Sequence, residues 1–349
     1  MDPINFLIEF LEIYSPTGEE ERASMFLYRK MQEFGFETRI DQVGNVIGKI
    51  GDGKPAILLC GHIDTVPGFI TVRQVGDEIF GRGAVDAKGP LAAMIMAARD
   101  FVREKIKGMV IVAGVVDEEG ASRGIKNIIA SGLEADYAVF GEPSNARNVV
   151  IGYKGRIHFI LKVKTRASHP ASPAAHNASE EMINAWNRIR SVLVKEGGGK
   201  LRSPSCSIIS IKGDLTEAEM EVSIRVPFGI TWREVFNVVN LVINEVDKEV
   251  ECQLELIDAV DPYESNKGSP LIEVFRKAIN DVFGEEAKLL RKTGTGDMNY
   301  YGNWLRAGDA VTYGPGDPRF DHTKEERIRV EEYLGAIEVL RRVIRSVIS

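Results

Sequence analysis

The sequence predicts a doubly wound α/β domain that is interrupted by a small α+β domain. Three observations lead to this fold class. Four short apolar runs alternate with helical patterns, which is typical of buried parallel strands joined by helices. The middle of the chain instead alternates polar and apolar residues, which is typical of antiparallel strands with one wet face. The chain has 349 residues, more than one hydrophobic core usually organises, so two domains are expected.

The doubly wound part is predicted from both ends of the chain. Residues 1–15 form an amphipathic pattern, and residues 18–36 repeat apolar side chains on one helical face that stops at Gly35. A further helix is expected over residues 88–105, between the first two apolar runs. The four runs, which are the expected parallel strands, cover residues 56–60, 109–116, 137–140 and 310–313.

The middle segment is predicted to be a ferredoxin-like α+β domain. The expected elements include strands over 156–165, 220–226 and 250–257, a helix that begins near Asn177, and a helix over 231–247. The order strand, helix, strand, strand, helix, strand is the split βαβ pattern. Turn-forming linkers at 141–148 and 261–270 flank it. We therefore expect an inserted domain at 153–262 and a surrounding domain made of 1–152 and 263–349.

Composition and charge exclude several classes of protein. A formal net charge of −7 argues against a general nucleic-acid binder. No apolar stretch reaches the roughly 18 residues of a membrane span, and the start lacks the basic region of a signal peptide. Cys60, Cys206 and Cys252 are scattered, so neither a disulfide framework nor a thiolate zinc site is indicated. A cytoplasmic protein is the expectation.

Acids and histidines gather where the apolar runs end. His62 and Asp64 follow the first run, Glu118 and Glu119 follow the second, Glu142 follows the third, and His322 comes after the fourth. Asp86 lies in the loop just before residue 88. The carboxyl ends of parallel strands lie on one side of a sheet, so these residues can meet there. A divalent cation would relieve the repulsion among buried acids, and nitrogen and oxygen ligands suit zinc, cobalt or manganese. This many groups allow two metals. Asp64 is expected to accept the second ring N–H of His62.

Five motifs in this order resemble the two-metal amidohydrolase and peptidase family, which includes acetylornithine deacetylase, succinyl-diaminopimelate desuccinylase, aminoacylase and related carboxypeptidases. They are GHIDTVP, GRGAVDAKGPLAAM, VDEEGASRG, FGEPS and YGPGDPRFDHTKEE. The resemblance runs from about residue 5 to residue 345 and implies a zinc-peptidase-like catalytic domain with a lid and dimerisation domain. VDAKGPLAAM and KTGTGDMNYYG look more narrowly like hydrolases that release lysine or ornithine from an amino-group carrier protein in lysine and arginine biosynthesis.

The resemblance implies a role for each site residue. The implied ligands are His62 and Glu142 for one ion and Glu119 and His322 for the other, with Asp86 as the bridge; zinc or cobalt is implied. Glu118 would be the general base, and Asp64 would support His62. The peptide bond between Asp86 and Ala87 would be cis. Family aminopeptidases tend to carry aspartate in place of Glu142, so acyl-amino-acid or carboxypeptidase-like substrates are favoured.

The resemblance also assigns residues in the inserted domain and in a glycine-rich loop. His169 would support the oxyanion, commonly in the active site of a partner subunit, and Arg225 would grip the substrate carboxylate. The implied substrate-binding residues further include Asn177, Thr295 and Gly296, the last replacing a serine that is common in relatives. His176 stands where relatives usually have glycine, and its role stays open. A homodimer through the inserted domain is expected.

Other functions remain open beside the carrier-protein hydrolase. Within the family, the alternative is an N-acetyl-lysine or N-acetylornithine deacetylase, or a small-peptide carboxypeptidase. A metal-binding protein without catalysis would bind metal and hydrolyse nothing. Gly53 and Lys54 fit a P-loop, but Pro55 replaces its Ser/Thr. An acidic carrier should require a basic rim, which could be formed by Lys154, Arg156, Lys162, Lys164, Arg166, Arg291 and Lys292.

Overall fold

The structure is a computed structural model of the whole chain, and it describes all residues except 167–175, 195–198, 246–248, 306–308 and 349. Contacts divide the chain into two compact units. The first unit consists of Met1–Ile151, Ser265–Leu290 and Tyr300–Ser349, and the second of Gly152–Glu264 and Arg291–Asn299. Within the described ranges, no helix is long and apolar enough to cross a membrane.

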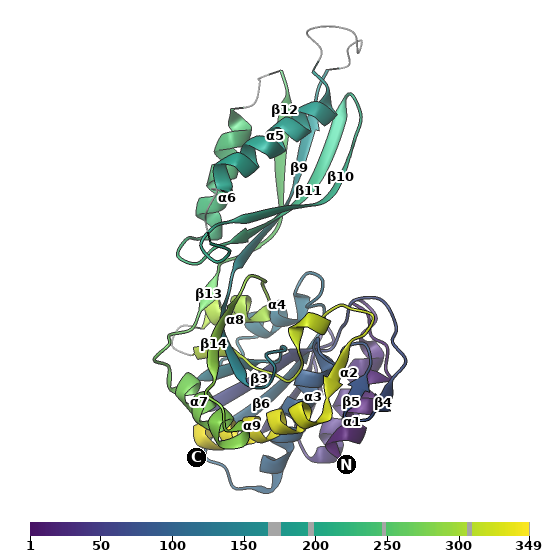
Figure 1. The fold of residues 1–349 in the computed structure, drawn as a ribbon, viewed down its shortest axis with the longest axis vertical. Coiled ribbons are helices and arrows are strands. Elements are labelled where there is room, and N and C mark those ends of the chain that lie inside the picture. Colours follow the sequence, from purple (N-terminus) through teal and green to yellow (C-terminus); the bar gives the residue numbers. More distant parts are fainter. Residues whose placement is uncertain (167–175, 195–198, 246–248, 306–308, 349) are drawn as a thin grey trace. The chain divides into compact units, whose positions relative to one another are not determined.

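Helices and strands alternate along most of the chain (Figure 1). The helices are α1 (Pro3–Leu11), α2 (Glu21–Phe34), α3 (Lys88–Arg99), α4 (Arg123–Ala130), α5 (Ala178–Leu193), α6 (Trp232–Asn244), α7 (Pro270–Phe283), α8 (Asp297–Trp304) and α9 (Val330–Ile348), with short 3-10 turns η1 (Asp100–Arg103) and η2 (Pro318–Phe320). The strands are β1 (Glu37–Ile40), β2 (Val46–Ile50), β3 (Ala56–His62), β4 (Arg73–Val75), β5 (Glu78–Phe80), β6 (Met109–Val115), β7 (Tyr137–Phe140), β8 (Asn148–Tyr153), β9 (Gly155–Lys164), β10 (Ser205–Gly213), β11 (Glu217–Val226), β12 (Glu251–Val260), β13 (Tyr263–Glu264), β14 (Lys288–Lys292), β15 (Asp309–Thr312) and β16 (Arg327–Arg329).

The main sheet confirms the predicted doubly wound arrangement. Its strands run in the order β1-β2-β6-β3-β7-β15-β8, and β13 and β14 pair with β8. The four central strands, β6, β3, β7 and β15, are parallel and coincide with the four apolar runs. The chain passes from β3 to β6 on one side and then to β7 on the other, so the strand order reverses at β3. Doubly wound sheets bind their ligands beyond the carboxyl ends of the strands at such a point.

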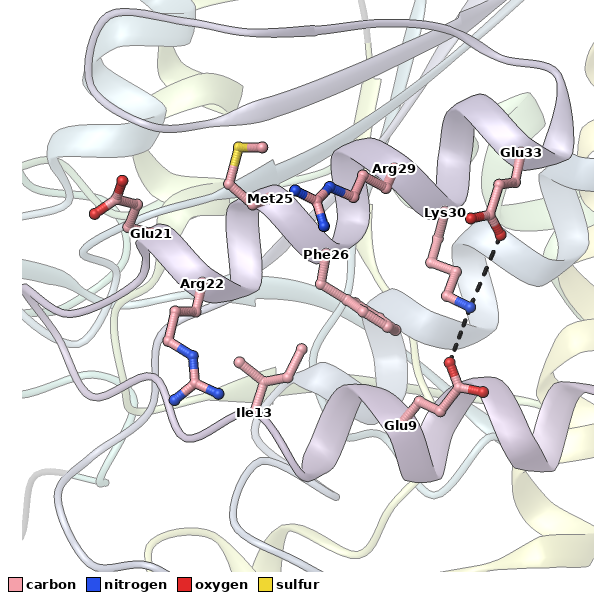
Figure 2. Close-up of a pocket in the computed structure, with 9 residues that line it drawn as sticks. All are labelled: Glu9, Ile13, Glu21, Arg22, Met25, Phe26, Arg29, Lys30 and Glu33. Carbon is pink, nitrogen blue, oxygen red and sulfur yellow. Dashed lines mark ion pairs between the residues drawn. The ribbon is translucent and has the colours of Figure 1, made fainter.

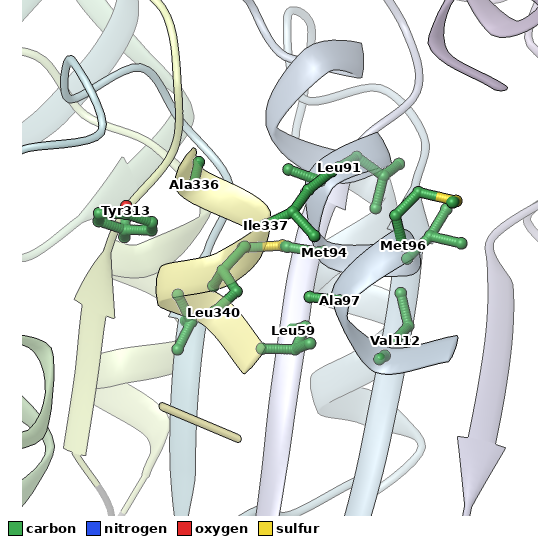
Figure 3. Close-up of a cluster of buried hydrophobic side chains, with 14 of the residues drawn as sticks. Leu59, Leu91, Met94, Met96, Ala97, Val112, Tyr313, Ala336, Ile337 and Leu340 are labelled. Atoms are coloured by element: carbon green, nitrogen blue, oxygen red, sulfur yellow. The ribbon is translucent and has the colours of Figure 1, made fainter. Parts of the chain in front are cut away.

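Helices cover both faces of this sheet because successive strand residues point to opposite sides. Leu59 of β3 and Val112 of β6 belong to the core cluster that also contains α3 and α9 (Figure 3). Phe140 of β7 lies on the other face, where its ring centroid is 6.0 Å from that of Tyr301 in α8. Each buried aliphatic side chain contributes roughly 1.5–3 kcal/mol, so this core holds the strand ends in fixed places.

The second unit has the ferredoxin-like order that the sequence predicts. Its antiparallel sheet runs β10-β11-β9-β12, and β9 and β11 bury alternate residues. The helices α5 and α6 pack on this sheet, with Asn177 as the N-cap of α5 and a Thr231–Glu234 capping box on α6. Residues Arg291–Asn299 also belong to this unit, outside the single insertion that the sequence suggests.

The insertion leaves and rejoins the first unit at adjacent points. The main-chain N–H of Ser265 donates to the carbonyl oxygen of Ile151 at 2.8 Å. The hydroxyl of Ser265 also donates to the carbonyl oxygen of Ala310 in β15. Ile151 and Ser265, the two residues of the first unit that flank the insertion, are therefore joined by a hydrogen bond within that unit.

Candidate metal centre

The predicted ligands lie at or beyond one end of the parallel strands of the first unit. His62 is the last residue of β3, and Glu119 and Glu142 follow the ends of β6 and β7. Asp86 stands just before α3, and His322 comes after η2 in the long loop beyond β15. Strand order thus brings together residues that are far apart in sequence, as parallel topology requires.

One group of potential ligands consists of His62, Asp86 and Glu142. Their ligand atoms all lie within 4.8 Å of one another. The Nε2 atom of His62 is 3.0 Å from Oδ1 of Asp86 and 3.5 Å from Oε1 of Glu142. His62 is buried, whereas the side chains of Asp86 and Glu142 are 13% and 22% exposed, so the group faces outward on its carboxylate side.

A second group consists of Asp86, Glu119 and His322, and it shares Asp86 with the first. The Nε2 atom of His322 is 3.0 Å from Oδ2 of Asp86 and 2.9 Å from Oε1 of Glu119. Asp86 therefore presents one carboxylate oxygen to His62 and the other to His322. A carboxylate divided in this way has the arrangement of a bridging ligand between two cations.

Charges at these groups favour bound cations. Burial alone would lower the pKa of His62, but its contacts with Asp64 and Asp86 raise that pKa well above its usual value. Hydrogen bonds to Asp86 and Glu119 raise the pKa of His322 to about 10. The imidazoles can therefore hold protons that balance the surrounding carboxylates, and a divalent ion can replace those protons. Imidazole nitrogens with carboxylate oxygens fit zinc or a similar ion.

Asp64 supports the centre in a different way from the one expected. The Nδ1 atom of His62 is 2.9 Å from the main-chain oxygen of Asp64 and 3.6 Å from its carboxylate, so the carbonyl accepts the ring proton. The carboxylate of Asp64 accepts hydrogen bonds from the main-chain N–H groups of Glu118 and Glu119, each at 3.1 Å. The Thr17 hydroxyl donates to the same carboxylate at 2.8 Å. Asp64 thus connects the His62 segment with the Glu118–Glu119 segment.

Glu118 lies beside the ligands but in neither group. Its charge is one of those that raise the pKa of His62, after the contacts with Asp64 and Asp86 and the charge of Glu142. The preceding residue, Asp117, has a positive φ of 65° and stands two residues after the end of β6. A Cβ atom at Gly120 would approach Oδ1 of the Asp117 side chain to 2.3 Å, so any larger residue there would force that side chain to move. The Asp86–Ala87 peptide bond is cis, as the resemblance implies.

Candidate substrate residues of the second unit take part in its internal structure. Asn177 caps α5 by accepting from the main-chain N–H of Ser179 at 3.0 Å. The Thr295 hydroxyl donates to the carbonyl oxygen of Lys154 at 2.7 Å, and Gly296 donates its N–H to the side-chain oxygen of Asn299 at 3.1 Å. The remaining candidates are Arg225 on β11, His176, whose Nδ1 lies 3.0 Å from Glu181, and His169, which lies outside the described residues.

Three polar residues near the potential ligands were not singled out from the sequence: the buried Lys88 and Glu326 and the half-buried Thr17. Lys88 lies two positions after Asp86, and its Nζ donates to the carbonyl oxygen of Ile13 at 2.5 Å. Burial lowers the pKa of Lys88 to about 7. The sequence signal that could have found Lys88 is a single charge at the start of α3, a helix that is otherwise apolar up to Arg99.

A pocket elsewhere in the first unit is not a candidate for this chemistry. Its volume is about 730 Å³. Figure 2 shows the residues that line it, which come mainly from α1 and α2. The Nζ atom of Lys30 lies 2.9 Å from Glu9 and 3.8 Å from Glu33, so Lys30 pairs with two acids of the pocket wall. Its lining contains no histidine or cysteine and none of the predicted site residues.

Known proteins resemble this chain over nearly its whole length. A protein of Pyrococcus abyssi is 40% identical over 345 residues, which cover 98% of this chain and 93% of that protein, and it is named provisionally as a LysW-lysine/LysW-ornithine hydrolase. The LysW-lysine/LysW-ornithine hydrolase of Sulfurisphaera tokodaii is 33% identical, with 96% of this chain and 94% of that protein covered. The crystal structure of an M20 family metallo-carboxypeptidase from Sulfolobus solfataricus superposes with a TM-score of 0.80 at 17% identity, covering 99% of each chain.

A family model agrees with these similarities. The model for peptidase family M20/M25/M40 matches residues 58–346, which include all the potential ligands described above. The chain therefore belongs to peptidase family M20/M25/M40 and is a hydrolase of amide bonds.

Proposed function

We propose that the protein hydrolyses the amide bond that joins lysine or ornithine to an amino-group carrier protein. Two relatives that align over nearly the whole chain are named for this activity. The observation that carries the chemistry is Asp86, whose two carboxylate oxygens each lie 3.0 Å from a different histidine, His62 and His322. One carboxylate shared between two imidazoles supports a two-metal hydrolase.

The residues around Asp86 would hold two divalent ions. We assign His62 and Glu142 to one ion, Glu119 and His322 to the other, and Asp86 to both. Zinc fits this donor set best, and cobalt is an alternative. When bound, the ions would supply Lewis-acid activation of water and of the scissile carbonyl.

Glu118 would move the proton in the reaction. Its carboxylate would take a proton from the attacking water and deliver it to the nitrogen of the leaving lysine or ornithine. Asp64 supports this role because its carboxylate holds the main-chain N–H of Glu118 at 3.1 Å. The same carboxylate holds Glu119, so the base and a ligand are positioned by one buried side chain.

Residues of the second unit would recognise the substrate. A guanidinium binds a carboxylate with two parallel hydrogen bonds, which suits Arg225 to the α-carboxylate of the released amino acid. His169 would stabilise the oxyanion that forms at the carbonyl. Thr295 and Asn177 already use their side chains within the unit, so we assign them, with Gly296, to shaping the pocket wall.

We further propose that residues 153–262 act as a lid and dimerisation domain of a homodimer. Strand β10 is at an edge of its sheet and exposes Ile208, Ile209 and Ile211 by 39%, 57% and 51%. Apolar edge strands tend to pair with another chain. Light scattering of Ile209→Lys should show monomers if this edge forms the dimer, and an unchanged dimer would refute it.

We also propose that the protein is cytoplasmic. Its three cysteines are free thiols, which supports a reducing compartment.

The basic residues suggested for carrier docking are largely occupied by neighbouring acids. Arg156, Lys162 and Lys164 lie 2.9, 2.6 and 2.9 Å from carboxylates of Asp258, Glu255 and Glu217, respectively. Lys154 is buried and donates to the carbonyl oxygens of Lys200 and Ser203. These residues therefore lend little support to the carrier assignment, which depends on the relatives.

Direct competition of substrates tests the proposal. Zinc-loaded protein is incubated with carrier-lysine, carrier-ornithine, N-acetyl-lysine and a dipeptide, and released amino acid is measured by chromatography, with Glu118→Gln as the inactive control. We expect kcat/KM for a carrier conjugate to exceed the others by at least about tenfold, a difference of about 1.4 kcal/mol. Faster hydrolysis of N-acetyl-lysine would replace the carrier assignment with a deacetylase. Bound metal without any hydrolysis would favour a metal-binding protein.

A further inference from the structure

A buried carboxylate stands directly behind the loop that carries Asp86. The Glu326 side chain is 1% exposed. Its Oε1 accepts hydrogen bonds from the main-chain N–H groups of Val85 at 2.9 Å and of Asp86 at 3.0 Å. Its Oε2 lies 2.7 Å from Nη1 of Arg82. Both oxygens are therefore engaged, and Glu326 is in neither group of potential ligands.

The main chain of Glu326 is tied to the same loop. Its carbonyl oxygen accepts from the N–H of Gly81 at 3.2 Å, and the following strand β16 pairs with β5, with Ile328 opposite Ile79. Glu326 also follows His322 in the same segment. Side chain and backbone together thus join the His322 segment to the segment that ends in Asp86.

Arg82 extends the connection to a third segment. Its Nη1 pairs with Glu326, and its Nε donates to the carbonyl oxygen of Gly68 at 3.0 Å. Gly68 comes shortly after His62 and Asp64. The Arg82 side chain is 7% exposed, so its interaction with Glu326 is poorly screened by solvent. The pair therefore links segments that carry ligands of both groups.

We propose that Glu326, together with Arg82, is a positioning residue that sets the orientation of the bridging carboxylate of Asp86 for both metal ions. This inference rests on the proposed two-metal centre. Glu326 binds the N–H of Asp86 itself, so it fixes the peptide plane from which the Asp86 side chain starts. A small rotation of that plane moves both carboxylate oxygens, which contact different histidines. Loss of Glu326 should consequently weaken the binding of both metal ions, whereas loss of His322 should weaken mainly the binding of one.

Matched variants separate positioning from general stability. Glu326→Gln keeps an oxygen that can accept from the N–H groups of Val85 and Asp86 but loses the charge that pairs with Arg82. Glu326→Ala removes both the accepting oxygen and the charge. Asp136→Asn is the control, because Asp136 likewise accepts a main-chain N–H, that of Ala56 at 2.7 Å, and pairs with Lys54 at 3.0 Å. That contact lies at Ala56, the opposite end of β3 from His62.

The test is calorimetric titration of metal-free full-length protein with Co²⁺, together with the visible absorption spectrum of the bound ions. Outer-shell residues typically change metal affinity by about 10–100-fold. We expect about tenfold weaker binding at both sites in Glu326→Gln, about 100-fold in Glu326→Ala, and a change below about twofold in Asp136→Asn. His322→Ala should weaken one binding event much more than the other.

Each result has a distinct meaning. If the wild type binds fewer than two ions, the proposed two-metal centre fails. If the wild type binds two ions and a folded Glu326→Gln binds them with unchanged affinity and spectrum, only the role of Glu326 is refuted. An equal loss in Asp136→Asn would refute it too, by attributing the effect to stability. Should Glu326→Ala not fold, Glu326→Gln, which keeps the size of the side chain, decides.

Discussion

Asparagine in place of Asp64 should disturb the base-bearing segment with almost no change in side-chain size. The Asp64 carboxylate accepts from the N–H groups of Glu118 and Glu119, each at 3.1 Å, and from the Thr17 hydroxyl at 2.8 Å. An amide has only one accepting oxygen, and its NH₂ group would face a donor. Hydrogen bonds to charged groups contribute roughly 1.5–3 kcal/mol each. With one or two of them lost, we expect the free energy of unfolding to fall by about 2–4 kcal/mol.

The assay is urea unfolding of the metal-free protein followed by circular dichroism, so that metal binding does not add to the measured stability. In the loaded enzyme, kcat/KM should fall by about 10²–10³, which corresponds to roughly 3–4 kcal/mol of transition-state stabilisation. Thr17→Val is the matched control, because it removes one donor and leaves both N–H groups bound; it should cost about 1.5 kcal/mol, the low end of that range, because this hydrogen bond is only partly buried. Wild-type stability of Asp64→Asn, or an equal effect of Thr17→Val, would refute the reasoning.

Three further predictions concern the base, the metal and pH. Glu118→Gln should keep both ions but lower kcat by at least about 10³, measured with the carrier conjugate; activity near wild type would place the base elsewhere. Chelation with EDTA should abolish hydrolysis, and zinc or cobalt should restore it, whereas activity that survives complete metal removal would contradict the metal assignment. Burial raises the pKa of Asp309 to about 6, so folding favours its protonated form. Between about pH 4 and pH 6 the Asp309 carboxyl is ionised in the unfolded chain but still protonated in the folded protein. The free energy of unfolding should therefore fall as pH rises through this range and stay constant above it. Asp309→Asn should be about 1 kcal/mol more stable than wild type at pH 8 and equal to it at pH 4, allowing for partial solvent screening; a difference independent of pH would be incompatible with this.

Sequence patterns predicted the elements whose burial is periodic. The runs that became β3, β6 and β7 are apolar on both faces because helices cover both sides of the sheet, and such runs are visible without a structure. The positions of His62 and Glu119 followed, because a parallel sheet gathers its carboxyl ends on one side. Their roles as ligands stay predictions that metal titration can decide.

Contacts between distant segments could not be read in the same way. Glu326 is one of two adjacent glutamates, a pattern that usually belongs to solvated surface, yet in the structure it is buried and contacts Arg82, Val85 and Asp86. The preference of the His62 ring for the Asp64 carbonyl over its carboxylate depends on where the Glu118 N–H lies. The assignment of Arg291–Asn299 to the second unit likewise depends on tertiary packing and has no periodic signal.

The hydrogen bond between Ser265 and Ile151 has a consequence for protein engineering. The main-chain nitrogen of Ser265 lies 2.8 Å from the carbonyl oxygen of Ile151. A short turn could therefore replace residues 152–264 without stretching the backbone. The shortened protein would keep every proposed metal ligand and would lack Arg225 and His169. Such a miniature would allow ion capture to be studied apart from substrate selection, and other recognition modules could be spliced at the same junction.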